Sequence, residues 1–259
     1  AGIALARTIV RDLFEREKAA SMIGYVTMAM AIAPMVVPSI GGLLQEYVAW
    51  WGSSAFMLIF SMVLFFGAYI NLHETNHNLG VKVHFSQLMR NYAALLCNKR
   101  FIAFSFTCGF SSGVFFSFMG GGPLLSAQIL SLTPIGYGLH SIFIASGYSF
   151  GNFISGRLTQ STGLLPMIMH GTILNLLGIM VASGLFFAGF VHPLSLFGPM
   201  FLISFANGIT LPATIAGAIS VRSDLAGTAS GLTGFIQIGF GALCATLTAE
   251  WLDQSLSIW

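Results

Sequence analysis

The sequence predicts an all-α polytopic membrane protein. Charged residues make up 7% of the 259 positions and hydrophobic residues 56%, whereas soluble domains carry about 25% charged residues. A soluble domain needs polar side chains to cover its surface, so lipid must contact most of this chain. The ten basic residues are scattered in short clusters, which argues against a nucleic-acid partner.

Seven apolar segments have about the 20 residues that a helix needs to cross a bilayer. None of them contains Lys, Arg, Asp or Glu. Their continuous apolar character argues against an outer-membrane barrel, whose strands alternate polar and apolar residues. The segments are 19–44, 52–72, 101–120, 136–156, 165–190, 194–219 and 226–249.

The basic residues predict the orientation of these segments. With seven crossings, alternate connections lie on opposite sides of the membrane, and all ten Lys and Arg residues then fall on one side. The positive-inside rule identifies that side as the cytoplasm. We therefore expect a multi-pass protein of the cell membrane, which in a bacterium is the inner membrane.

The connection over residues 73–100 is the longest, and it is polar. Two segments precede it and five follow, which predicts two helical bundles: the end of an N-terminal bundle over 1–72, a cytoplasmic linker over 73–100 and a C-terminal bundle over 101–259. His73 and His77 lie one helical turn apart in this linker, but no third ligand is ordered around them, so we expect no metal site.

Prolines and glycines gather in the first complete segment. Pro34 and Pro38 lie one turn apart, and the pair Gly41 and Gly42 follows in a helix that opens at Gly24. Each proline removes a backbone hydrogen bond and kinks the helix. The pattern predicts a bent, closely packed gating element. The alternative is that prolines are simply commoner in membrane helices.

Four residues are candidates for a substrate cavity. Asn207 and Gln237 carry amides that are costly against lipid, so they should face a wet cavity or, alternatively, bond to another helix. Met28 and Phe116 belong to soft apolar surfaces that suit varied ligands. Side chains that face lipid would have the same composition, so that alternative stays open.

Gly156 and Arg157 are predicted to form a short cytoplasmic turn after a helix end. An arginine there can pair with exposed carbonyls or with acids and hold a cytoplasmic gate closed. The alternative is a plain basic anchor at the membrane surface.

Small residues recur at helical spacing in three segments, which predicts close helix packing, either static or sliding. The three stripes are Ser105, Gly109, Gly113 and Ser117; Gly171, Asn175, Gly178 and Ala182; and Gly227, Gly231, Gly234, Gly241 and Ala245.

The Pro34, Pro38, Gly41 and Gly42 pattern resembles the fifth helix of drug:proton antiporters of the major facilitator superfamily, although Val37 stands where that family has glycine. Further stretches resemble the Bcr/CflA drug-resistance branch, and together they cover nearly the whole chain. These stretches are residues 4–20, 120–128, 137–158 and 207–237.

The resemblance implies a major facilitator-type two-bundle helical transporter that is incomplete, with about seven full transmembrane helices. Residues 1–72 would hold the end of the fourth helix to the sixth, and 101–259 the seventh to the eleventh. The implied function is proton-coupled efflux of drug-like or hydrophobic small molecules by a secondary active transporter, as in antibiotic resistance. We expect a monomer that needs no cofactor.

Two alternatives stay open: a metabolite exporter or importer of the same fold, because fold does not fix substrate, and an inactive truncated remnant. We expect no enzyme, because the segments hold no paired aspartates, histidine cluster or Ser-His pair. Proton coupling needs a titratable group inside the membrane. Since the seven segments hold no acid, we expect the proton carrier in helices that precede this chain.

Overall fold

The computed structural model describes residues 37, 40–48, 50–71 and 85–256. Residues 40–47 are helical. The remaining elements of the described part are also helices, in the order α3 (Gly52–Asn71), α4 (Phe85–Leu96), α5 (Lys99–Gln128), α6 (Pro134–Thr162), α7 (Leu164–Phe187), α8 (Pro193–Ser220), the short η1 (Ser223–Leu225) and α9 (Ala226–Leu256). The described part therefore confirms the all-helical prediction.

Five of these helices are long and apolar enough to cross a membrane: α3, α5, α7, α8 and α9. The helix α6 is also long, at 29 residues, but its many glycine and hydroxyl residues make it less apolar. Most of the first predicted segment, 19–44, lies outside the described residues.

The helices α5 and α6 are longer than their predicted segments. Gly120 and the residues after it read as a break, yet α5 continues through Pro123 to Gln128. The glycines serve close packing instead, because a Cβ added at Gly120 would lie 2.5 Å from the Ala245 carbonyl oxygen of α9. The length of about 20 residues that spans lipid is a minimum, and helices extend beyond it.

The predicted linker over 73–100 contains the helix α4, which the polar composition did not predict. Leu95 on α4 is fully buried and packs with Phe101, Ala218 and Ala229 from α5, α8 and α9. The side chain of Asn98 then accepts hydrogen bonds from the backbone N–H groups of Arg100 and Phe101, and so caps the start of α5. A capped start and a buried leucine fix this end of the linker against the bundle.

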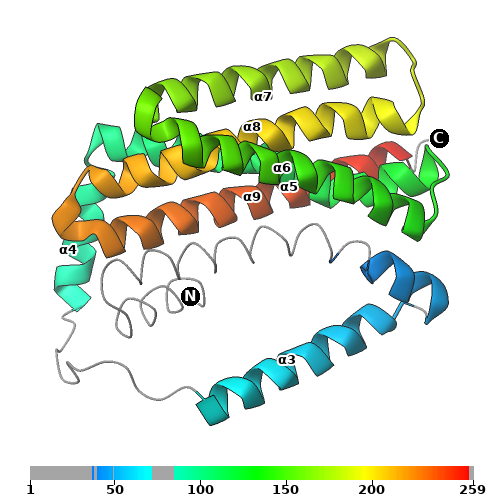
Figure 1. The fold of residues 1–259 in the computed structure, drawn as a ribbon, viewed down its shortest axis with the longest axis horizontal. Coiled ribbons are helices and arrows are strands. Elements are labelled where there is room, and N and C mark those ends of the chain that lie inside the picture. The colour runs from blue at the N-terminus through cyan, green and yellow to red at the C-terminus, as the bar shows by residue number, and fades with distance from the viewer. Residues whose placement is uncertain (1–36, 38–39, 49, 72–84, 257–259) are drawn as a thin grey trace.

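The helix α8 lies at the centre of the bundle formed by α5 to α9 (Figure 1). It packs against α5, α6 and α7, while α5 packs against α9. In the most apolar stretch of α8, 61% of the residues are buried inside the protein, whereas none of the residues in the corresponding stretch of α3 are buried. The helices α6 and α8 cross at Gly151 and Gly208, where a Cβ on Gly208 would lie 2.7 Å from the Asn152 backbone nitrogen.

The helix α3 lies apart from this bundle (Figure 1). Its phenylalanine, methionine and leucine side chains are exposed along its whole length, for example Phe65 at 66% and Met57 at 68%. Such a surface is stable only against lipid or other apolar helices.

Candidate functional site

The predicted gating element is described only at its end. Gly24, Met28, Pro34 and Pro38 lie outside the described residues, so their roles stay predictions. Gly42 is buried against the start of α6, where a Cβ would lie 2.5 Å from the Pro134 carbonyl oxygen.

Gly41, the neighbour of Gly42, has no described atom within 4 Å of a Cβ position. Among the described contacts of the glycine pair, therefore, only those of Gly42 require a close backbone approach to α6.

A cavity of about 280 Å³ lies beside this glycine pair, between residues 40–47, α3, α5 and α6. Its lining is uncharged and includes Gly41, Gly42, Ser126, Thr133 and Tyr137. The Ser126 hydroxyl is buried and has no hydrogen-bond partner among the described residues. The sequence did not single out Ser126. A serine that follows glycines and a proline in a membrane helix is a pattern that many packing residues share.

Asn207 is buried in the interface between α7 and α8. The Asn175 side-chain amide nitrogen donates a hydrogen bond to the Asn207 amide oxygen over 3.1 Å. The other two amide atoms, Asn175 Oδ1 and Asn207 Nδ2, and the nearby Ser204 hydroxyl have no partner among the described residues. Asn207 therefore bonds to another helix, which is the alternative to lining a cavity. A contact of Asn207 with substrate stays a prediction.

Gln237 also bonds to another helix. Its side-chain amide nitrogen donates to the Ser112 hydroxyl of α5 over 3.0 Å. A second polar contact of the same interface joins the Ser105 and Thr233 hydroxyls at 3.1 Å. The face that joins α5 to α9 thus carries two polar contacts, about two turns apart along α5 and about one turn apart along α9.

Phe116 packs against α9, where a Cβ added at Gly241 would lie 2.6 Å from its ring. This contact places Phe116 at a helix interface. It leaves Phe116 half-buried, so its predicted place in a cavity wall stays a prediction.

The first two small-residue stripes mediate close packing. A Cβ on Gly178 of α7 would lie 2.6 Å from Ile203 of α8, and one on Gly113 of α5 would lie 3.0 Å from the Cys244 sulfur of α9. In the third stripe, by contrast, Gly227, Gly231 and Gly234 have nothing within 4 Å among the described residues. Only the second half of that stripe, from Gly241, packs against α5.

Gly156 and Arg157 lie within α6, which continues to Thr162, so the predicted turn at these residues is wrong. In the last turns of α6 the Thr162 hydroxyl donates to the Leu158 carbonyl oxygen, so this polar side chain has a hydrogen-bond partner within the helix. The Arg157 guanidinium carbon lies 4.5 Å from the centre of the Phe153 ring, which is a cation–π contact.

In the part of the chain that the structure describes, no acid lies within ion-pair distance of Arg157. The role of Arg157 as a gate latch therefore stays a prediction. Arg157 lies on the exposed surface of α6 and not in a turn.

An ion pair that sequence reasoning missed lies in the turn before α9. Arg222 donates to both carboxylate oxygens of Asp224 over 2.9 and 2.7 Å. Hydrogen bonding to Arg222 lowers the pKa of the Asp224 carboxyl. The signal was present as a basic and an acidic residue two positions apart, but such spacing is common in turns and seldom specific.

Comparison with known proteins agrees with this architecture. The family model of the Major Facilitator Superfamily matches residues 1–245. The chain is 23% identical to a bicyclomycin resistance protein homolog of Haemophilus influenzae over 96% of this chain and 63% of that protein. It is 26% identical to the MFS-type transporter YdgK of Bacillus subtilis, over 95% of this chain and 62% of that protein.

The chain is also 23% identical to the multidrug transporter MdfA of Yersinia pestis, over 70% of this chain and 44% of that protein. The chain thus spans less than two thirds of the length of these relatives. The family match and the drug-resistance relatives confirm the resemblance to the drug-resistance branch of this superfamily. The chain belongs to the Major Facilitator Superfamily, a family of membrane transporters, and is a multi-pass protein of the cell membrane.

Proposed function

We propose that this chain forms the larger part of a secondary active transporter that exports drug-like or hydrophobic small molecules in exchange for protons. The observation that carries the proposal is the chemistry of the bundle interior. Its buried polar side chains in the described residues are Ser, Thr and Asn, without a charged group. Such an interior can solvate neutral amphipathic molecules, whereas a charged metabolite needs a charge of opposite sign.

The names of two relatives support the same substrate class, since one is a bicyclomycin resistance homolog and another a multidrug transporter. Residues 1–72 are proposed as the end of an N-terminal bundle, 73–100 as the linker and 101–259 as the C-terminal bundle. The protein is proposed to act as a monomer in lipid and to catalyse no covalent chemistry.

Proton coupling is proposed to rest on a carboxylate outside the seven apolar segments, because those segments hold none. The described helices contribute packing and gating. In this scheme the close approach of Gly42 to α6 lets the gating element move against the C-terminal bundle.

The test uses inside-out membrane vesicles that carry the protein encoded by the complete reading frame around this sequence. Radiolabelled chloramphenicol serves as the neutral probe and a labelled dicarboxylate as the charged comparison. We expect an acidic vesicle interior to drive chloramphenicol uptake, and a protonophore to abolish it. Uptake that is independent of the pH gradient would refute antiport, and preferred uptake of the dicarboxylate would refute the substrate class.

A further inference from the structure

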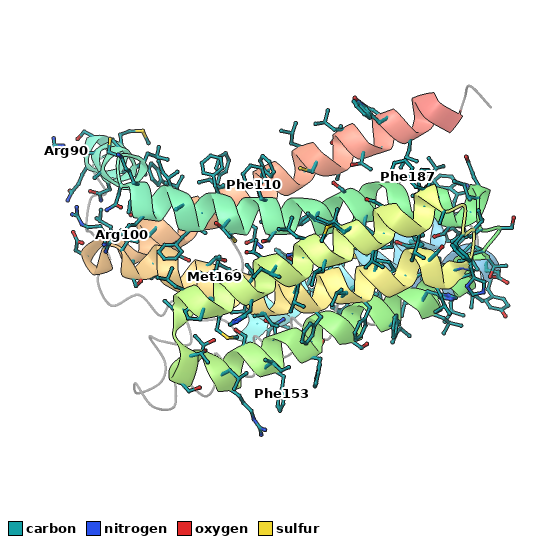
Figure 2. All side chains as sticks on the ribbon, turned by 90° about the horizontal axis from the view of Figure 1, so that it is seen from above. Arg90, Arg100, Phe110, Phe153, Met169 and Phe187 are labelled. Carbon is teal, nitrogen blue, oxygen red and sulfur yellow. The ribbon has the colours of Figure 1, made fainter. Side chains whose placement is uncertain are left out.

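A groove of about 840 Å³ opens at the end of the bundle where α4 meets α5. Its lining comes from the start of α5, the start of α7 and the end of α8, with Asn98, Lys99, Arg100, Phe104, Leu165 and Ser220 among its residues. Figure 2 shows Arg100 and Arg90 at this end of the bundle, with Phe187 at the opposite end. By the positive-inside rule, this end faces the cytoplasm.

Two positive charges on this groove have no acidic partner in the described part of the chain. Lys99 and Arg100 are exposed, and neither lies within ion-pair distance of a described acid. The acid described at this end is Asp224, and Arg222 holds it at 2.7 Å. The groove therefore presents an unneutralised positive rim, which attracts an anion.

Apolar side chains lie next to this positive rim. Leu165 at the start of α7 is 65% exposed. Phe104 stands about one turn along α5 from Arg100, and it packs against α8, where a Cβ on Gly217 would lie 2.7 Å from its ring. A cationic rim beside the exposed Leu165 and the half-buried Phe104 matches a molecule with an anionic head and a hydrocarbon tail. Free phosphate would leave the exposed Leu165 side chain without an apolar partner.

We propose that this groove binds an anionic phospholipid of the cytoplasmic leaflet. Lys99 and Arg100 donate hydrogen bonds to the headgroup phosphate, and Leu165 and Phe104 contact an acyl chain. Basic pockets between membrane helices on the cytoplasmic side are suited to such headgroups. The bound lipid would connect α5, α7 and α8 at one end of the bundle. This proposal depends on the membrane placement of the chain and is independent of the exported substrate.

The chain offers a matched control for the charge. Arg90 and Arg157 lie in α4 and α6, and neither lines the groove. The double variant Arg90→Gln with Arg157→Gln therefore removes the same net charge as Lys99→Gln with Arg100→Gln. Leu165→Trp keeps both charges and fills the apolar part of the groove.

The experiment measures lipid retention by the purified chain in detergent, using native mass spectrometry with phosphatidylglycerol, phosphatidylcholine or inorganic phosphate. We expect wild type and the Arg90/Arg157 control to retain phosphatidylglycerol, and the Lys99/Arg100 variant to bind it at least tenfold more weakly. Leu165→Trp should also weaken the retention of phosphatidylglycerol. Because this variant keeps Lys99 and Arg100, it tests the site if the Lys99/Arg100 variant does not fold.

Three results would overturn the proposal. Equal weakening in the Arg90/Arg157 control would show general charge attraction without a site. Equal retention of phosphatidylcholine would show that the positive rim does not select the anionic headgroup. Binding of inorganic phosphate that is as strong as lipid binding, and that is unchanged in Leu165→Trp, would show that the apolar side chains take no part.

Discussion

The Asn175–Asn207 hydrogen bond joins α7 to α8, and its removal should reveal how these buried amides are solvated. The two side chains are 5% and 2% exposed. Each also carries one amide atom without a partner among the described residues. Replacing Asn207 by valine has three effects: it breaks the bond, leaves the Asn175 amide nitrogen unpaired, and removes the unpaired Asn207 nitrogen from the interior.

An interhelical hydrogen bond in a membrane protein is worth ~0.6 kcal/mol on average and up to ~1.7 kcal/mol. The newly unpaired nitrogen of Asn175 and the removed unpaired nitrogen of Asn207 each correspond to about 1–3 kcal/mol, with opposite signs. They roughly cancel, so we expect Asn207→Val to lower the free energy of unfolding by about 1 kcal/mol.

The double variant Asn175→Val with Asn207→Val removes every polar atom of the pair. Because the interface is then apolar on both sides, it should be at least as stable as wild type. If each single change costs about 1 kcal/mol, the coupling energy of the double-mutant cycle is about 2 kcal/mol. The assay is reversible unfolding in mixed micelles, followed by circular dichroism, for the four proteins of the cycle.

The matched control pairs Asn207→Val with Gln237→Val. Gln237 bonds to Ser112 at the separate interface of α5 with α9, so the two changes should add to within ~0.5 kcal/mol. Additive losses for Asn175 and Asn207 themselves would contradict the reasoning, because they would mean that the two amides contribute nothing jointly. A single loss well above 2 kcal/mol would show that bound water already satisfies the other amide atoms.

Three further changes test other parts of the described structure. Gly171→Ala places a Cβ against the Thr210 hydroxyl and 3.1 Å from the Ala206 carbonyl oxygen of α8, and it should lower the free energy of unfolding by about 1–3 kcal/mol. Gly184→Ala, with no described atom within 4 Å, should leave the melting midpoint unchanged or raise it. Ser126→Ala removes a buried hydroxyl that has no hydrogen-bond partner among the described residues and should raise the melting midpoint; a clear decrease would mean that the cavity supplies a partner. Because Arg222 lowers the pKa of Asp224, the pair should stabilise its turn above the ordinary carboxyl pKa and lose this effect as pH falls through the lowered pKa. Carbon-13 NMR titration should show the Asp224 pKa rising toward its ordinary value in Arg222→Gln, and an unchanged pKa would contradict the ion pair.

The sequence predicted helices well because lipid imposes one strong requirement. Every backbone polar group inside a membrane must be paired, and a helix pairs its own. Apolar length therefore located the spans α3, α5, α7, α8 and α9 to within several residues at each end. Helix ends were less predictable, because a glycine or a charged residue at the membrane surface does not by itself stop a helix. Arg157 illustrates this, since α6 passes through it to Thr162.

The sequence could not predict which apolar side chains face protein and which face outward. Phe110 and Phe118 both lie on α5, yet Phe110 is 58% exposed and Phe118 is 9% exposed. Both environments favour the same residue type, so composition does not separate them. The same holds for Gly231 and Gly241 on α9, of which only Gly241 meets a neighbouring helix in the described residues. Only the facing helix distinguishes a packing glycine from an open one.

The hydrogen bonds between helices divide the bundle into two groups. Most Ser and Thr hydroxyls bond to a carbonyl of their own helix, as Thr210 bonds to Ala206, and so tie no helix to another. Side-chain bonds join α5 to α9, α7 to α8 and α6 to α8 through Ser155 and the Ile209 carbonyl at 3.4 Å.

Between α5 and α8 the contact is instead mostly apolar, with Phe104 against Gly217 and the Phe118 ring against the Phe197 ring. Apolar side chains can shift past one another without breaking a hydrogen bond, whereas the polar contacts within each group must break before its helices separate. We therefore expect relative movement within this bundle to occur between the pair α5 and α9 and the trio α6, α7 and α8, with the α5–α8 contact as the plane of movement.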